Sequence, residues 1–113
     1  MFARQNRLRK NTDIIRVYRR GKKISTQHLV LNYFSNPRTS LRVAVVASKK
    51  LDKRATVRNR AKRRVREVLK NELQNKEIIG FDILVSIKTD ISQVNNNDLS
   101  LQIGRLVKGI DSR

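Results

Sequence analysis

The sequence predicts an α/β sandwich in which helices pack on a single small sheet. Short β-branched segments alternate with longer segments of helical periodicity, and this alternation is typical of an α/β domain. The expected order is a helix, two or three strands, a helix, a strand and a helix. The chain has 113 residues, enough for one small core, so we expect a single domain over residues 1–113.

The N-terminal part predicts a basic tail followed by a short helix. Residues 1–10 are basic and mostly polar, and we expect them to be irregular and flexible. The segment NTDIIRVYRRG (11–21) predicts a helix, because its apolar side chains recur on one side. Asn11 or Thr12 would cap this helix, and Gly21 would end it.

The rest of the chain predicts three strands and two helices. HLVLNYF (28–34) is a strand candidate, and LRVAVVAS (41–48) is a β-branched strand that we expect in the middle of the sheet, because it is apolar on both faces. Residues 57 to about 75 predict a helix, and FDILVSIK (81–88) alternates as a strand does. An amphipathic helix over residues 99–110 would follow an Asn-rich loop.

The charge is large and unevenly distributed. The net charge is +18, and residues 1–70 carry 22 Lys and Arg but only three acidic residues. Residues 71–113 carry five basic and six acidic residues. A solubility charge has no reason to polarise in this way, so the sequence predicts a dedicated basic face. Its partner would be nucleic acid, with an anionic membrane surface or an acidic protein as less favoured alternatives.

Other sequence features bear on disulfide bonds, membrane association and location. The absence of cysteine excludes disulfides and thiolate chemistry. No apolar run approaches the length of a membrane span, so we expect no membrane partner. The N-terminus has no hydrophobic signal segment, which favours a cytoplasmic location.

Side chains suited to catalysis are scarce. His28 is the only histidine and stands at the edge of a strand, where an ordinary surface or packing role is favoured over metal ligation. Asp82, Asp90 and Asp98 are spaced as scattered, solvated acids rather than as a metal site. The four glycines form no phosphate-binding loop, and no nucleophile–base pair is visible. We therefore expect no catalytic residue in this chain.

The helix that begins near residue 57 carries the strongest functional signal. Six of the nine residues from Arg58 to Arg66 are Lys or Arg. Glu67 is the single acid among the nine basic residues from Lys53 to Lys70, so nucleic-acid contact is favoured over a merely solvated helix. On a helical wheel the apolar side chains share one arc that would pack on the sheet, namely Val57, Ala61, Val65, Val68 and Leu69.

A second candidate surface lies between the first helix and the sheet. Ile14 and Tyr18 are an i, i+4 pair on the helix, and Val30, Asn32 and Phe34 share one strand face. If the helix lies over that face, an apolar and aromatic groove could stack single-stranded bases. The residues alone favour a core role for these side chains, because a small core has few aromatic residues to draw on.

At this point the sequence resembles the bacterial ribonuclease P protein family. VRNRAKRRVRE after VASKKLDKRAT is similar to the family signature, with its Arg-Asn-Arg motif opening a basic helix. RLRKNTDIIRVYRRGKK, LVLNYF, RVAVVASKK and FDILVSI extend the resemblance across the chain. It implies a two-layer α/β sandwich with three helices and an approximately four-stranded mixed sheet, including an unusual left-handed βαβ crossover through the basic helix.

The resemblance also implies a function. The family protein joins a large catalytic RNA, one protein per RNA, and this endoribonuclease removes the 5′ leader from precursor tRNA. The RNA carries out the Mg²⁺-dependent phosphodiester hydrolysis and holds most of the Mg²⁺. By motif, RNA contact is assigned to Arg58, Asn59, Arg60, Lys62, Arg63, Arg64 and Arg66, although position 64 is often apolar in relatives.

The same resemblance places a leader groove between the first helix and the sheet. Its residues here are Ile14, Tyr18 and Asn32, with Lys49 and Lys50 on a nearby loop. Ile14 and Asn32 stand where an aromatic residue is common, so fewer bases can be stacked. The alternative function is a structural, ribosomal-type RNA-binding protein without a role in processing. A DNA-binding module is disfavoured, because no helix-turn-helix pattern is present.

Overall fold

Four strands form one mixed sheet in the computed structural model, which describes residues 4–37, 40–74 and 78–110. The order across the sheet is β1-β2-β4-β3, with β1 and β2 antiparallel, β2 and β4 antiparallel, and β3 parallel to β4. The strands are β1 (Lys22–Ser25), β2 (Leu29–Ser35), β3 (Arg42–Ala47) and β4 (Phe81–Ile87).

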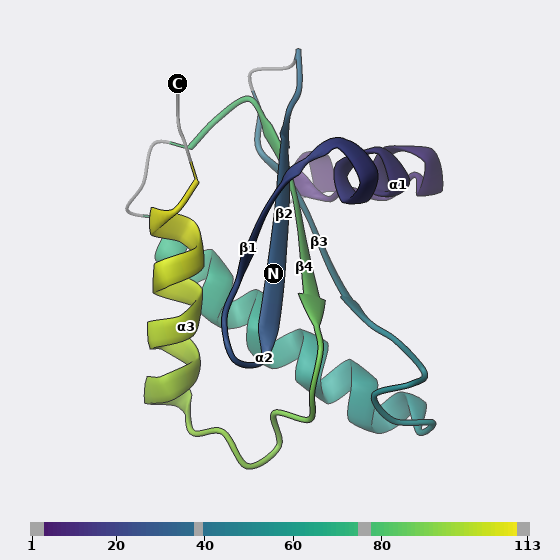
Figure 1. Cartoon of the computed structure of the whole chain (residues 1–113), viewed down its shortest axis with the longest axis vertical. Coiled ribbons are helices and arrows are strands. Elements are labelled where there is room, and N and C mark those ends of the chain that lie inside the picture. The colour runs from purple at the N-terminus through teal and green to yellow at the C-terminus, as the bar shows by residue number, and fades with distance from the viewer. Residues whose placement is uncertain (1–3, 38–39, 75–77, 111–113) are drawn as a thin grey trace.

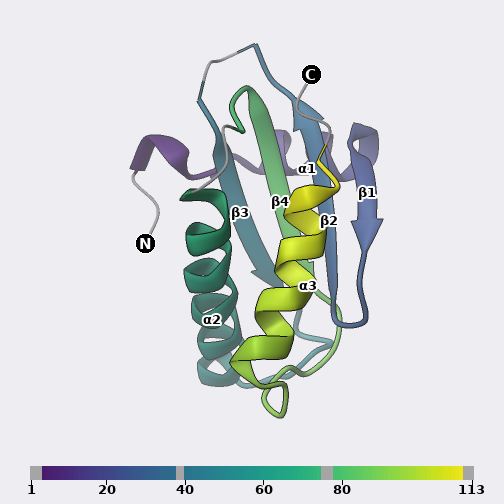
Figure 2. The ribbon, with the colours of Figure 1, turned by 90° about the vertical axis from the view of Figure 1, so that its left-hand side faces the viewer.

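Helices cover both faces of this sheet. The helices α2 (Ala55–Gln74) and α3 (Asn96–Lys108) lie on one face, and α1 (Asn11–Arg20) lies on the other (Figure 1). In Figure 2, which is seen from the side of α2 and α3, β3 and β4 both run downward, and β4 lies to the right of β3. The connection from β3 through α2 to β4 is therefore left-handed, against the usual rule. The predicted α/β sandwich with three helices and a four-stranded mixed sheet is confirmed.

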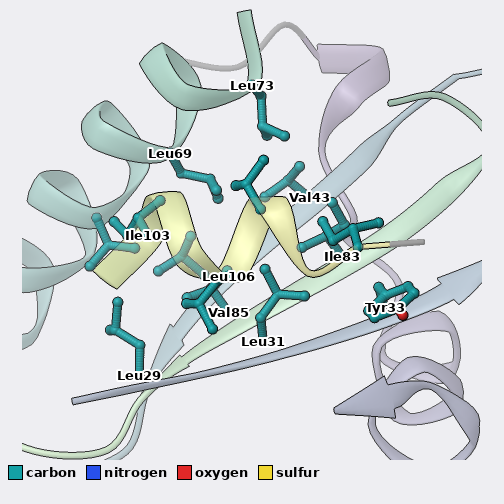
Figure 3. Close-up of a cluster of buried hydrophobic side chains, with 14 of the residues drawn as sticks. Leu29, Leu31, Tyr33, Val43, Leu69, Leu73, Ile83, Val85, Ile103 and Leu106 are labelled. Carbon is teal, nitrogen blue, oxygen red and sulfur yellow. The ribbon is translucent and has the colours of Figure 1, made fainter. Parts of the chain in front are cut away.

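The main core lies between the sheet and the pair α2 and α3 (Figure 3). Alternate residues of each strand face this core, as the two-residue period of a strand requires. The apolar stripe of α2 meets them at helical spacing, and α3 contributes its own buried stripe. Its fully buried members include Leu29, Leu31, Val65, Leu69, Ile83, Val85, Leu99, Ile103 and Leu106.

The face beneath α1 holds a smaller apolar cluster. Leu8, Val17 and Leu84 are buried there, and Ile14 and Phe34 pack against them while half-buried. The cluster is small because one helix of ten residues covers this face. Part of the face consequently remains open beside α1.

Two local expectations differ from the structure. Within the expected flexible tail, Arg4–Asn6 form a 3₁₀ turn (η1) and Leu8 is only 4% exposed; residues 1–3 lie outside the described residues. The Leu8 N–H donates to the Val43 carbonyl at 2.8 Å, because the outer edge of β3 has free backbone acceptors. The segment expected in the middle of the sheet, β3, is an edge strand. Val43 and Val45 are buried in the main core, whereas Val46 on the α1 face is 37% exposed.

The turn from α1 into β1 depends on a glycine. The Gly21 N–H donates to the Val17 carbonyl at 2.9 Å and closes the helix, as expected. A Cβ at this position would lie 2.7 Å from the carbonyl oxygen of Tyr33 on β2. Any larger residue would push β1 away from its partner. The strand β1 itself was not located by the sequence, since Lys-Lys-Ile-Ser is short and polar.

Candidate nucleic-acid interface

The basic residues of α2 lie on the side of the helix opposite its buried apolar stripe. Asn59, Arg60 and Arg63 are exposed, whereas Lys62 and Arg66 are half-buried on the flanks of the helix. Among the described residues, Arg60, Arg63 and Arg66 have no carboxylate partner. Their guanidinium groups therefore remain available to phosphate oxygens, which they can bind as forks.

The loop before α2 is braced by its own charged groups. Arg58 donates from Nη1 to the carbonyl oxygens of Asp52 at 2.8 Å and Lys53 at 2.9 Å. The Asp52 carboxylate accepts from the backbone N–H of Arg54 at 2.8 Å and from its guanidinium at 3.0 and 3.1 Å. The side-chain hydrogen bond from Arg54 lowers the pKa of Asp52 below its ordinary value. Arg58 thus fixes the loop that leads into the basic helix.

Arg64 differs from the other cations of α2, because its guanidinium is occupied within the protein. It donates to the carbonyl oxygens of Ile91 at 2.7 Å and Val94 at 2.6 Å, and to Asn96 Oδ1 at 3.0 Å. These acceptors lie in the loop between β4 and α3 and at the start of α3. Three bonds tie that loop to α2, so Arg64 has a structural role within the fold.

A hollow of about 360 Å³ opens where α1, the N-terminal segment and β3 meet. Ile14 of α1 lines one side and Arg66 of α2 lines another. The remaining lining residues are Arg7, Leu8, Arg9, Val43, Ala44, Val45 and Val46. An apolar floor with arginines at its rim can hold an unpaired base and its phosphates.

Of the residues predicted for the groove, only Ile14 lines this hollow. Tyr18 is 66% exposed on α1, one turn further along the helix. Lys49 and Lys50 are exposed in the turn that follows β3. Asn32 does not reach the surface: it is 3% exposed beneath α1, and its Oδ1 has no hydrogen-bond partner. A surface contact for Asn32 is therefore not seen in the structure, because α1 covers that part of the strand.

Tyr33 points to the opposite face, as its neighbour's orientation predicts. It packs in the main core edge-on against Phe81, with ring centroids 5.7 Å apart and planes at 73°. This geometry is a favourable one for two aromatic rings. Tyr33 is therefore unavailable to a ligand on the α1 side.

An ion-pair network that the sequence did not reveal joins α1 to the sheet. Arg42 binds Asp82 through two parallel bonds, from Nε at 2.8 Å and from Nη2 at 2.7 Å, and its Nη1 lies 3.3 Å from Asp13 on α1. Asn36 also donates to Asp82, at 2.7 Å. The hydrogen bond to Asp82 raises the pKa of Arg42 above its ordinary value. Asp82 was expected to be a solvated acid, but it is 3% exposed, because these partners compensate the burial of its charge.

His28 has a packing role, as expected. Its Nδ1 lies 2.9 Å from Gln102 Nε2, and Gln102 Oε1 accepts from the His28 N–H at 3.1 Å and from Thr26 Oγ1 at 2.8 Å. In the described part of the chain no three His, Cys, Asp or Glu side chains come together as a metal site. Over the same residues, none of the helices has both the length and the apolar character of a membrane span.

Comparison with known proteins identifies the family. The family model described as Ribonuclease P matches residues 2–111. The ribonuclease P protein component of Clostridioides difficile (strain 630) is 31% identical over 110 residues, which cover 97% of this chain and 96% of the relative. That of Pseudanabaena sp. (strain PCC 6903) is 35% identical over 100 residues, covering 88% and 85% of the two chains.

Solved structures agree with the sequence comparison. The RNase P protein from Thermotoga maritima, in complex with 1-(4-fluorophenyl)-2-thiourea, superposes with a TM-score of 0.79 at 29% identity, covering 93% of this chain and 100% of that one. The Staphylococcus aureus RNase P protein gives 0.78 at 26% identity, covering 91% and 93%. The chain therefore belongs to the ribonuclease P protein family.

Proposed function

We propose that this chain is the protein subunit of ribonuclease P and that it acts in 5′ maturation of tRNA in the cytoplasm. In this proposal one copy binds one catalytic RNA through the exposed cations of α2, and the hollow beside α1 holds the single-stranded 5′ leader of precursor tRNA. The RNA cleaves the phosphodiester bond and holds the Mg²⁺ ions. The protein contributes affinity and orientation, and no side chain of this chain takes part in the chemistry.

The observation that carries the proposal is the position of Arg66. It belongs to the basic helix and also lines the hollow. A leader in the hollow would therefore run directly beside an RNA bound to α2. Mature tRNA has no leader to fill the hollow, so the protein would favour precursor over product.

The charge distribution supports a second contribution. Two RNA chains that meet at a cleavage site repel each other, and cations placed between them reduce that repulsion. The complex should consequently need less Mg²⁺ with the protein than without it. A structural RNA-binding protein would also neutralise charge, but it would not distinguish precursor from mature tRNA.

The test is cleavage of precursor tRNA by a bacterial ribonuclease P RNA at low Mg²⁺, with and without this protein. The proposal expects stimulation that decreases as the leader is shortened to about one nucleotide, because the hollow then stays empty. Stimulation that is independent of leader length would mean that the protein acts only by neutralising charge on the RNA. Absence of stimulation with several bacterial RNAs would favour the structural RNA-binding alternative.

A further inference from the structure

A second group of cations lies at the C-terminal end of α1 and on β1, the edge strand that follows it. Arg19 on α1 and Lys22 and Lys23 on β1 are all exposed, and we name these three residues the terminal strip. None of them forms an ion pair with a residue that the structure describes. The strip is therefore positive charge without an internal counterion.

Structural roles account for only part of this charge. Cations at a helix C-terminus interact favourably with the helix dipole, and lysines on an edge strand discourage sheet-to-sheet pairing. Yet five of the eight residues from Arg16 to Lys23 are Lys or Arg, more than either role needs. The acid of α1, Asp13, is turned towards Arg42 and Arg16 instead. An aromatic side chain, Tyr18, stands exposed directly before the strip.

The strip and the hollow lie at opposite ends of α1. The chain enters α1 beside β3, where Leu8 is bonded to Val43, and leaves it through Gly21 into β1. Because β3 and β1 are the two edges of the sheet, α1 crosses from one edge to the other, behind the sheet in Figure 2. Ten helical residues span about 15 Å, or roughly four nucleotides at ~3.4 Å along a strand.

Arg19 and Arg20 lie on different sides of α1. At about 100° per residue, Tyr18 lies about 40° from Ile14, and Arg19 follows on the same flank. Arg20 falls on the other flank, with Asp13, which faces the Arg42 network. Lys23 pairs with Asn32 and shares its face of the sheet, the face that α1 covers. Lys22 pairs with Tyr33 and lies on the other side of the same edge strand. A strand that leaves the hollow past Tyr18 would therefore meet Arg19 and Lys23 before it meets Arg20.

We propose that the terminal strip binds the phosphate backbone of the upstream part of the leader, beyond the nucleotides that fill the hollow. This inference rests on the proposed function. Arg66 lines the hollow at the β3 end, so the cleavage site lies towards that end and the upstream nucleotides leave over Tyr18 towards β1. The ligand is a single-stranded polyanion: one of its bases stacks on Tyr18, and the phosphates beyond that base bind the cations of the strip.

The test compares precursor tRNAs with leaders of about four and about ten nucleotides, bound to the assembled protein–RNA complex. The triple variant Arg19→Gln, Lys22→Gln, Lys23→Gln removes the strip and keeps the side-chain stems. A control variant, Arg20→Gln, Arg105→Gln, Lys108→Gln, removes three charges from other exposed positions. Thermal unfolding of all three proteins establishes that they fold alike.

With the long leader, the strip variant should bind about tenfold more weakly and lose about two units of salt slope, at ~0.7 per single-strand phosphate contact. With the short leader it should match the parent protein, and the control should match the parent with both leaders. A further measurement needs no variant: the parent's salt slope should be about two units steeper with the long leader than with the short one.

Each other outcome overturns the inference. Equal loss with both leaders would mean that the strip contacts the catalytic RNA or the tRNA body. No loss with either leader would mean that it contacts neither. The proposed function fails separately, namely if the parent complex gains nothing from a short leader over mature tRNA.

Discussion

The two faces of the sheet are held by different forces. Beneath α2 and α3 the buried side chains are almost all apolar and form one continuous cluster. Beneath α1 the apolar cluster is reduced, in the described part of the chain, to Leu8, Val17 and Leu84 with a few half-buried neighbours. There the ion-pair network of Arg42 with Asp82 and Asp13 ties the helix to the sheet.

This difference shows how one small domain can be stable and still carry an open groove. The main core contains most of the buried apolar side chains and supplies the stability. The α1 face gives up apolar burial, so a hollow remains between α1 and β3. A directional network suits such a face, because bidentate bonds fix the position of a helix without filling the space beside it.

The largest effect should come from the main core. Leu69→Ala removes a fully buried side chain between α2 and the sheet and should lower the free energy of unfolding by about 3–5 kcal/mol. Val17→Ala, the fully buried position on α1, should cost only about 2 kcal/mol, because fewer methyl groups are lost and the open face can relax. Urea unfolding measures both, with exposed Leu101→Ala as the control. Equal costs would contradict the division between the two faces.

The second largest effect should come from breaking the ion-pair network of Arg42, Asp82 and Asp13. Asp82→Asn leaves Arg42, whose side chain is 13% exposed, with Asp13 as its remaining carboxylate, and should cost about 3 kcal/mol. Because α1 is then less firmly held, binding of precursor tRNA should weaken more than assembly with the catalytic RNA. Exposed Asp90→Asn is the matched control.

A double variant separates charge from packing at this site. Arg42→Met with Asp82→Leu should recover most of the lost stability, since a buried ion pair can be replaced by apolar side chains. It should not recover precursor binding if the network sets the position of α1. Recovery of both stability and precursor binding would show that apolar packing can position α1 as well as the ion-pair network does.

Variants of two adjacent arginines of α2 should show which cation stabilises the fold and which binds RNA. Arg64→Gln loses three hydrogen bonds to the loop before α3 and should cost about 1.5–3 kcal/mol of stability. Exposed Arg63→Gln should change stability by less than about 0.5 kcal/mol but reduce the salt slope of assembly by about 0.7–0.9 units. Thermal unfolding and RNA titration at several salt concentrations measure the pair. The opposite pattern would assign Arg64 to the RNA after all.

The smallest effect should be at the junction of the two surfaces. Arg66→Gln should leave stability nearly unchanged and should reduce the salt slopes of both assembly and precursor binding, each by less than about one unit. The reason is that Arg66 is the residue shared by α2 and the hollow. An effect on assembly alone would place the leader elsewhere.

Local patterns were sufficient for α2 but not for the α1 face. The apolar arc of α2 predicted the burial of Ala61, Val65 and Leu69, because helical periodicity alone decides which side packs. The role of Asp82 depends on Arg42 and Asn36, which are 40 and 46 residues distant in sequence. A single acid inside an otherwise apolar strand was the available signal, and it indicates a buried partner without identifying it.

The edge position of β3 was missed for a related reason. It depends on the order in which distant segments pair in the sheet, and no short-range pattern encodes that order. Arg64 looked like its basic neighbours in the sequence, since only the carbonyl groups of a distant loop distinguish it. The left-handed crossover came from family resemblance and not from the physics of the connection.

The most direct test of the account is a paired binding measurement on the two faces. Tyr18→Ala should weaken binding of leader-bearing precursor by about 1–3 kcal/mol per stacked base and leave assembly with the catalytic RNA unchanged. Arg60→Ala with Arg63→Ala should weaken assembly and flatten its salt dependence by about one to two units. If both variants affected assembly alone, or both affected precursor binding alone, the division of labour between the two faces would be wrong.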